Sequence, residues 1–234
     1  MHLHYDENGL DTGALSFSKT ALLSHLKAKP SVVSIVPLFA REREEVEQFI
    51  KDIYAKAYGA RIKIHYPVLM SVRNEKGDIL AATGFRPAAD YPLFLEQYLD
   101  RPVEQVLGLP RAEIVEIGNL ASDGGGASLF LFAAISAYLH HKGLTQAVVT
   151  STDFLEQRFK QMGLDPVRHA PADPSMLIGK DENWGTYYDT HPHVISGNVT
   201  HAYERLQSRF GAEYRTYPPR LFPRLHYQCD GERS

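Results

Sequence analysis

The sequence is poor in cysteine, in long apolar runs and in net charge, and each shortage excludes a class of protein. Its one cysteine, Cys229, rules out a disulfide within the chain. The polar surroundings of Cys229 also argue against a nucleophilic thiol, which needs a cationic partner in a cleft. No run of about 18 apolar residues occurs, so no membrane-spanning helix is predicted. Lys and Arg number 25 against 28 Asp and Glu, so the chain has no basic field to attract nucleic acid.

The N-terminal residues lack a targeting signal, and the chain lacks linkers and repeats. The stretch MHLHYDENGLDTG has no basic start, no apolar core and no small-residue cleavage site, which predicts a cytoplasmic location. The length of 234 residues favours one domain spanning residues 1–234. Within it, residues 1–30 are polar and predicted to be irregular, apart from a short helical patch at 19–26. Residues 170–234 are predicted to form a loop-rich C-terminal extension.

Apolar periodicity between these two segments predicts alternating strands and helices. The predicted strands cover residues 32–38, 62–73, 79–86, 113–122, 144–151 and 164–169. The predicted helices cover residues 41–57, 91–108, 127–141 and 153–162. A chain with this order is of the α/β class, in its mixed α+β form, and is expected to build one mixed sheet with helices on both faces.

A glycine loop follows the strand at 113–122 and opens the nearly all-apolar helix at 127–141. Glycines 124, 125 and 126 allow positive φ and a close approach to a ligand. The N–H groups at the start of the next helix, at Ala127 and Ser128, point back at the loop, an arrangement that binds phosphate. A plain turn that merely needs glycine is the other interpretation, and both remain open.

The loop matches neither of two common nucleotide-binding patterns. No Gly-Lys-Ser/Thr follows the glycines, and they lie too close together for a dinucleotide fingerprint. The order of hairpin, strand, glycine loop, buried helix, strand and short helix instead resembles the GNAT acyltransferase fold. In that fold the loop and helix N-terminus hold the pyrophosphate of coenzyme A.

Glu116 is a carboxylate inside an otherwise apolar strand, which costs free energy unless it is partnered. Strand alternation places Ile117 and Asn119 on one face, and Glu116 and Leu120 on the other. One interpretation is a general base, or an anchor for a substrate ammonium group. The alternative is a buried carboxylate that accepts hydrogen bonds from a structural arginine such as Arg86.

Several longer strings carry a family resemblance. They include LFLEQYLD (93–100), IVEIGNLAS (114–122) and WGTYYDTHP (184–192), together with YGARI, HYPVLMSV and GFRPA between residues 58 and 88. Over roughly residues 35–200 the sequence resembles the thermostable hemolysin family. The core of that family is similar to GNAT enzymes and, more distantly, to acyl-homoserine lactone synthases.

The resemblance implies a fold and an activity. The implied fold is a mixed, mostly antiparallel sheet flanked by helices on both faces. The strand at 113–122 should then run antiparallel to the hairpin and parallel to the strand at 144–151. The implied activity is transfer of an acyl group from a thioester to the amine of a small amino-acid-like acceptor, in small-molecule biosynthesis. The thioester is acyl-CoA or bound to a carrier protein, and an adenylate-forming ligase is a further expected partner.

The resemblance also implies site residues. Glu116 is expected to act as the base, the backbone N–H groups from Asn119 onward as an oxyanion hole, and Tyr187 or Tyr188 as the acid. Coenzyme A is expected at Leu120, Ala121, Ser122, Gly124, Gly125, Gly126, Ala127 and Ser128. The substrates are expected at Arg86, Glu96, Tyr98, Thr150 and Trp184. Structural pairing of Arg86 with a glutamate, a surface position for Glu96 and simple packing of the aromatic cluster at 184–188 are the alternatives.

The sequence departs from related enzymes at three places. Ala121 or Ser122 stands where GNAT enzymes usually have Arg or Gln, and Phe159 stands where they often have an acidic tyrosine. Gly118 and Asn119 replace the Ser and Arg that follow the Glu in acyl-homoserine lactone synthases. Two other functions therefore remain open, an inactive GNAT-like module that binds an acyl ligand and a membrane-active hemolysin. No metal is expected, because His191 and His193 lack a third ligand at a defined spacing.

Overall fold

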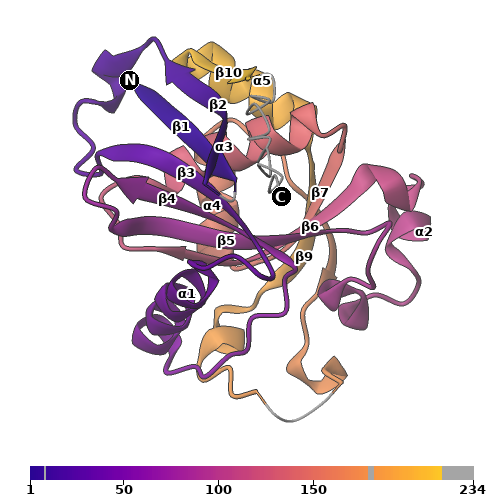
Figure 1. Cartoon of the computed structure of the whole chain (residues 1–234). Coiled ribbons are helices and arrows are strands. Elements are labelled where there is room, and N and C mark those ends of the chain that lie inside the picture. The colour runs from indigo at the N-terminus through magenta and orange to yellow at the C-terminus, as the bar shows by residue number, and fades with distance from the viewer. Residues whose placement is uncertain (8, 179–181, 218–234) are drawn as a thin grey trace, which may run out of the picture.

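One sheet of ten strands runs through the protein (Figure 1), as seen in a computed structural model that describes residues 1–7, 9–178 and 182–217. Its strands stand in the order β10-β2-β1-β3-β4-β5-β6-β7-β9-β8. The strands are β1 His2–Glu7, β2 Leu10–Phe17, β3 Pro30–Pro37, β4 Val68–Asn74, β5 Ile79–Pro87, β6 Ile114–Ser122, β7 Gln146–Ser151, β8 Val167–Pro171, β9 His193–Asn198 and β10 Ala212–Thr216.

Helices and short 3-10 turns connect the strands. The α-helices are α1 Arg43–Tyr58, α2 Val103–Leu107, α3 Ala127–His141, α4 Asp153–Gln161 and α5 Val199–Phe210. The 3-10 turns are η1 Thr20–Leu23, η2 Phe94–Tyr98, η3 Arg111–Glu113, η4 Pro174–Met176 and η5 Tyr187–Thr190.

The strand directions confirm the mixed sheet predicted from the sequence. Strand β6 runs antiparallel to β5 and parallel to β7. Among the described strands only one other neighbouring pair, β1 with β3, is parallel. The sheet is therefore mostly antiparallel, with its central parallel pair at the strand that carries Glu116.

Helices cover both faces of the sheet, as expected. Helix α3 is apolar all round because it is buried between the sheet and α5, and it packs on β3 to β6. Helix α1 has an apolar stripe at Val46, Ile50 and Tyr54, and it packs on β4 to β6 from the opposite face. Figure 1 shows α1 and α3 on opposite sides of the central strands.

The two ends of the chain are more regular than predicted. Residues 1–30 form the hairpin β1–β2, in which Leu3, Tyr5 and Leu15 are fully buried. The prediction of an irregular segment is wrong because only one face of this hairpin is apolar and the polar face dominates its composition. Residues 193–216 form β9, α5 and β10, so the extension is less loop-rich than expected. Residues 218–234, with Cys229, lie outside the described part.

The predicted helix at 91–108 is instead two short pieces, η2 and α2. Pro102 and the polar connections at 99–102 separate them. Backbone N–H groups in this segment, which a continuous helix would bond internally, are left to bond with side chains. Two glutamates accept them, as described below.

A bulge interrupts β6 at Asn119. Ala82 pairs with Ala121 and Gly84 with Gly118, so β6 has one residue more than β5 between these pairs. Asn119 has φ of +50°, a left-handed conformation that Asn tolerates better than most residues. Beyond the bulge the alternation changes phase, so Leu120 packs on the α3 side and Ala121 on the α1 side. The prediction that Leu120 shares a face with Glu116 is therefore wrong.

Candidate active site

The parallel strands β6 and β7 separate halfway along their length. Residues 114–117 of β6 pair with residues 146–149 of β7, and the pairing ends there. Beyond that point β6 continues along β5, while Thr150 and Ser151 of β7 continue along β9. The edge of residues 118–122 that faces β7 therefore has no strand partner there.

A cavity of about 40 Å³ lies at this separation. Its walls are mainly aromatic, and two basic residues, Lys63 and His65, lie exposed on its rim. The aromatic lining residues are Tyr54, Tyr66, Phe94, Tyr98, Trp184, Tyr187 and Tyr188, and the remaining ones are Gly118, Asn119 and Thr150. The residues come from α1, β6, β7, η2 and η5, and from the segments preceding β4 and η5.

The cavity brings together most of the residues that the sequence placed in the chemistry. Six predicted residues line it: Tyr98, Asn119, Thr150, Trp184, Tyr187 and Tyr188. Tyr54, Tyr66 and Phe94 also line the cavity, and they were not predicted as site residues from the sequence. The periodic pattern of α1 marks Tyr54 as buried, and Tyr66 lies in one of the strings that carry the family resemblance. Neither signal distinguishes a cavity wall from ordinary core.

The hydroxyl groups at the cavity are close to one another. The Tyr98 and Tyr188 hydroxyl oxygens are 2.6 Å apart, and the Tyr187 hydroxyl donates to the Thr150 carbonyl at 3.4 Å. Burial raises the pKa of Tyr188, although its hydrogen bond with Tyr98 opposes that rise. Thr150 Oγ1 is buried and has no hydrogen-bond partner among the described residues. The wall therefore holds the hydrogen-bonded hydroxyl groups of Tyr98 and Tyr188, together with a buried hydroxyl of Thr150 that has no partner among the described residues.

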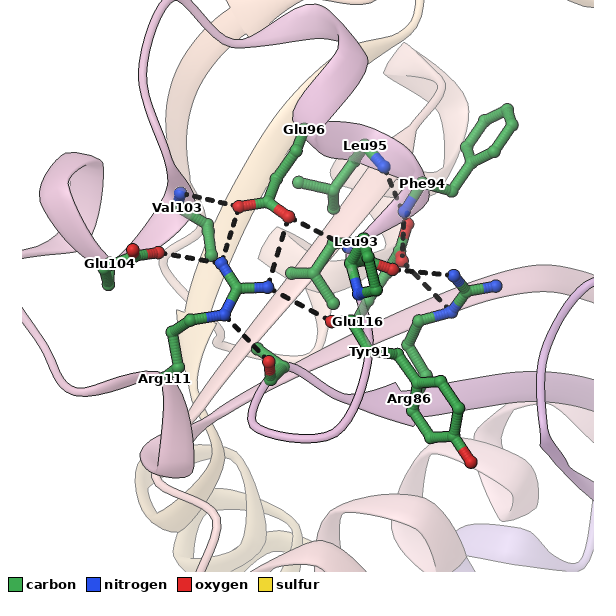
Figure 2. A network of polar contacts seen from close by, with 12 residues as sticks. Arg86, Tyr91, Leu93, Phe94, Leu95, Glu96, Val103, Glu104, Arg111 and Glu116 are labelled. Atoms are coloured by element: carbon green, nitrogen blue, oxygen red, sulfur yellow. Dashed lines mark hydrogen bonds and ion pairs between the residues drawn. The ribbon is translucent and has the colours of Figure 1, made fainter. Parts of the chain in front are cut away.

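Glu116 is 1 % exposed. Figure 2 shows its carboxylate beside Phe94, Leu95 and Arg86. Its two carboxylate oxygens accept the N–H groups of Phe94 at 2.8 Å and Leu95 at 3.0 Å. Arg86 Nε is 3.7 Å from Glu116 Oε2, and the Tyr66 hydroxyl is a further group that lowers the pKa of this carboxyl. Burial raises the pKa of Glu116, and these donors offset only part of the rise. Glu116 does not itself line the cavity, so its role as general base stays a prediction.

Arg86 makes mainly structural contacts. Its two terminal nitrogens donate to the carbonyls of Pro92 at 2.8 Å and His65 at 2.7 Å. Its guanidinium lies 5.0 Å from the centre of the Tyr66 ring. The predicted part of Arg86 in substrate binding therefore depends on a ligand replacing one of these contacts.

Glu96 belongs to a second polar cluster, seen opposite Glu116 in Figure 2. Its carboxylate accepts the N–H groups of Leu93 at 2.9 Å and Val103 at 3.1 Å. Arg111 pairs with Glu96 at 2.7 Å and with Glu104 at 2.8 Å. Burial alone would raise the pKa of Glu96, but Arg111 and the two N–H groups hold it below the ordinary value. Glu96 lies outside the cavity, and its predicted substrate contact stays a prediction.

The glycine loop has the conformation that the sequence suggested. Gly124, Gly125 and Gly126 all have positive φ, at 90°, 62° and 89°. Within the described residues, the N–H groups of Gly125 and Gly126 make no hydrogen bond. Leu26 packs on Gly126, and the N–H of Ala28 donates to the Gly125 carbonyl, while the Cα of Gly124 faces open space. The loop is therefore approachable from the Gly124 side.

Phe159 and the possible metal ligands are the remaining features that the sequence singled out. Phe159 of α4 packs on Phe132 of α3, with ring centres 5.1 Å apart, and does not line the cavity. Across residues 1–7, 9–178 and 182–217, no three His, Cys, Asp or Glu side chains gather as metal ligands. Absence of a metal remains an expectation.

Comparison with known protein families gives one match that spans most of the chain. The model of the family described as "Thermostable hemolysin" matches residues 38–203. The chain belongs to the thermostable hemolysin family. The matched residues include the cavity, the glycine loop and both glutamate clusters.

Solved structures show what the fold of this thermostable hemolysin family member resembles. BjaI, a CoA-dependent acyl-homoserine lactone synthase solved with SAM and isopentyl-CoA, aligns with a TM-score of 0.54 at 15 % identity. The alignment covers 76 % of this chain and 89 % of BjaI. TofI, solved in a ternary complex with an inhibitor and MTA, aligns with a TM-score of 0.54 at 14 % identity, over 75 % of this chain and 96 % of TofI. The predicted GNAT-like fold is confirmed.

No curated protein sequence matches this chain. No helix in the described part of this family member is both long and apolar enough to cross a bilayer.

Proposed function

We propose that the protein is an N-acyltransferase that moves an acyl group from a thioester to the amine of a small, amino-acid-like acceptor. The observation that carries this proposal is the separation of β6 from β7. It joins an extended groove, an aromatic cavity and a glycine loop along one strand. From the cavity at Gly118 and Asn119, along the unpaired edge to the glycines, a thioester donor has the matching parts in order: a reactive carbonyl, a linear arm and phosphates.

The donor would lie along the separated strands. Its amide-bearing arm would hydrogen-bond to the free edge of residues 118–122, and its phosphates would meet the N–H groups of Gly125 and Gly126. The loop offers no arginine or glutamine, so the backbone and the N-terminus of α3 would supply the positive potential. The resemblance of the fold to BjaI, which is CoA-dependent, supports acyl-CoA as donor. An acyl carrier protein, loaded by an adenylate-forming ligase, offers the same arm and phosphate.

The acceptor would enter the aromatic cavity. Rings such as Trp184, Tyr54 and Phe94 attract an ammonium group through their π faces, by about 0.5–2 kcal/mol each. On the rim, His65 is paired with Glu182 at 2.5 Å, so an acceptor carboxylate would have to take the place of Glu182 there. A cavity of about 40 Å³ holds the reacting end of a small molecule rather than a long chain.

Chemistry would take place between Asn119 and the tyrosine pair. Backbone N–H groups at Asn119 and Leu120, in the bulge, would stabilise the developing oxyanion. Tyr188 would protonate the departing thiolate, with Tyr187 holding Thr150 in place. Glu116 would receive the acceptor's proton.

The donor site is tested by a charge placed at the start of α3. Ser128→Asp should favour folding, because a negative charge suits a helix N-terminus. It should weaken binding of coenzyme A about tenfold or more, since like charges a few Å apart repel by on the order of 1–4 kcal/mol. Calorimetry with coenzyme A, and thiol release from acyl-CoA in the presence of amino acids, measure the two effects. Ser128→Asn is the matched control without charge.

The outcomes separate the three candidate functions. Equal binding by Ser128→Asp and Ser128→Asn would contradict the loop as a phosphate site. Binding of acyl-CoA by the wild-type protein without thiol release, from acyl-CoA or from an acylated carrier protein, would identify an inactive binding module. Leakage of dye-loaded phospholipid vesicles at sub-micromolar protein would favour a membrane-active hemolysin.

A further inference from the structure

Two glycines face each other across β5 and β6 beneath one tyrosine ring. Gly84 and Gly118 are register partners. A Cβ atom at Gly84 would lie 2.5 Å from Cγ of Tyr66, and one at Gly118 would lie 2.0 Å from the Tyr66 hydroxyl oxygen. Any side chain at either position would displace the ring. The glycine pair therefore leaves the space that the Tyr66 ring fills, and we call this pair the glycine seat of Tyr66. The sequence around neither glycine predicts it.

The neighbours of this seat hold Tyr66 from the other directions. Two positions along the same register, Arg86 is paired with Glu116 on the same face of the sheet. The Arg86 guanidinium lies over the Tyr66 ring, and the Arg43 side chain donates to the Tyr66 carbonyl at 2.7 Å. Tyr66 is 6 % exposed, so packing holds the ring in place on the sides that do not line the cavity.

Tyr66 joins the cavity to the buried carboxylate. It lines the cavity, whereas Glu116 does not. The Tyr66 hydroxyl lies over Gly118, two residues from Glu116 along β6, and it helps to hold down the pKa of that carboxyl, whose two oxygens also accept the N–H groups of Phe94 and Leu95. A substrate in the cavity therefore meets the Tyr66 hydroxyl where it cannot meet the carboxylate.

We propose that Tyr66 is a catalytic residue that relays the acceptor's proton to Glu116, and this inference rests on the proposed acyl transfer. The amine nitrogen attacks the thioester carbonyl carbon, so that a C–N bond forms and the C–S bond breaks. The N–H proton passes to the Tyr66 oxygen while the Tyr66 O–H proton passes to Glu116. Tyr188 protonates the thiolate. Glu116 later releases its proton to water and Tyr188 regains one, so the cycle balances.

Removal of one oxygen atom tests the relay. Tyr66→Phe keeps the ring over Gly84 and Gly118 but breaks the path. We expect kcat to fall about 10²-fold or more, within the range for general-base catalysis, with the KM for acyl-CoA unchanged. Tyr5→Phe is the matched control, because it removes a buried hydroxyl on the opposite face, bonded to the Ala134 carbonyl. It should leave kcat unchanged.

The pH profile distinguishes a relay from a packing role. In the wild type, kcat should rise with pH as Glu116 ionises and then level off. The groups that face Glu116 are Arg86, Tyr66 and Tyr98, together with two N–H donors. Tyr66→Phe should lose the plateau and keep rising with pH as hydroxide takes over. A loss of equal size at every pH would overturn the relay.

A double variant completes the test. Tyr66→Phe, Glu116→Gln should be no slower than the slower single variant, because both changes break one path. Multiplied losses, or an unchanged kcat in Tyr66→Phe, would overturn the relay while leaving acyl transfer standing. Absence of any thiol release from the wild type with acyl-CoA or acylated carrier protein would instead overturn the proposed function.

Discussion

Glu96 and Glu116 both accept hydrogen bonds from the same segment of chain, but the pKa values of the two carboxyl groups are shifted in opposite directions. Each accepts two backbone N–H groups from residues 93–103, and each has an arginine nearby. Glu96 is partly exposed and bonds Arg111 directly at 2.7 Å, whereas Glu116 is 1 % exposed and stands 3.7 Å from Arg86. The pKa of Glu96 is lowered by its donors, and burial raises that of Glu116.

The two carboxyl groups are therefore suited to different roles, and we propose an anchor at Glu96 and a proton acceptor at Glu116. A carboxylate with a lowered pKa holds its charge and serves as a fixed anchor. A carboxylate with a raised pKa sits nearer the range in which it can take up and release a proton. Only Glu116 also has a hydroxyl, Tyr66, between itself and the cavity.

The largest expected difference between the two glutamates is in turnover. Glu116→Gln keeps the size of the side chain but removes its basicity, so we expect kcat to fall by about 10²–10⁴-fold. Glu96→Gln should cost less than about tenfold, because it weakens only an anchor. Thiol release from acyl-CoA with an amine acceptor measures both. Glu156→Gln, a buried glutamate paired with Lys160 and Arg168, is the control and should keep normal turnover. Equal losses at Glu96 and Glu116 would remove the distinction drawn here.

A smaller difference is expected in stability. Glu116→Ala leaves two buried N–H groups and Arg86 without their acceptor, and should lower the free energy of unfolding by about 3–5 kcal/mol. Glu96→Ala should lower it by about 1–3 kcal/mol, since water reaches the groups it exposes. Urea denaturation followed by circular dichroism gives both values. A larger loss for Glu96→Ala would show that the exposed cluster, and not the buried one, holds the segment in place.

The smallest effect is the most diagnostic, because its sign differs between the two sites. The stabilisation from a lowered pKa is present above the ordinary glutamate value and is lost as pH falls through the folded value. Glu96→Gln should therefore cost more stability at neutral pH than in acid. The stabilisation from a raised pKa is present below the ordinary value and is lost as pH rises, so the cost of Glu116→Gln should shrink toward neutral pH.

Urea denaturation of both Gln variants across the acidic range measures these trends. Each unit of pKa shift corresponds to about 1.4 kcal/mol. Parallel trends in the two variants would show that Glu116 is charged and paired like Glu96, and the case for a proton-accepting Glu116 would fail.

The prediction of the fold succeeded where the signal is local. The apolar faces of residues 43–58 and 127–141, and the turn between β4 and β5, each depend on residues a few positions apart. The sequence did not predict the N-terminal hairpin or the strand β10. Each has one exposed face, and β10 pairs with β2 of the hairpin at the far end of the sheet. Their burial depends on partners about 200 residues away along the chain.

The sequence by itself determined that Glu116 would be a buried carboxylate and that Gly124 to Gly126 would take up positive φ. A carboxylate between Val115 and Ile117 is buried if its strand is central in the sheet. Three consecutive glycines are typical of a turn with positive φ. Only the tertiary structure decided which groups Glu116 meets. The bulge at Asn119, the glycine seat of Tyr66 and the aromatic cavity depend on strand register and on side-chain packing between distant segments. Strand register and the packing of distant segments do not follow from local periodicity, because a register is chosen by the contacts of the whole sheet.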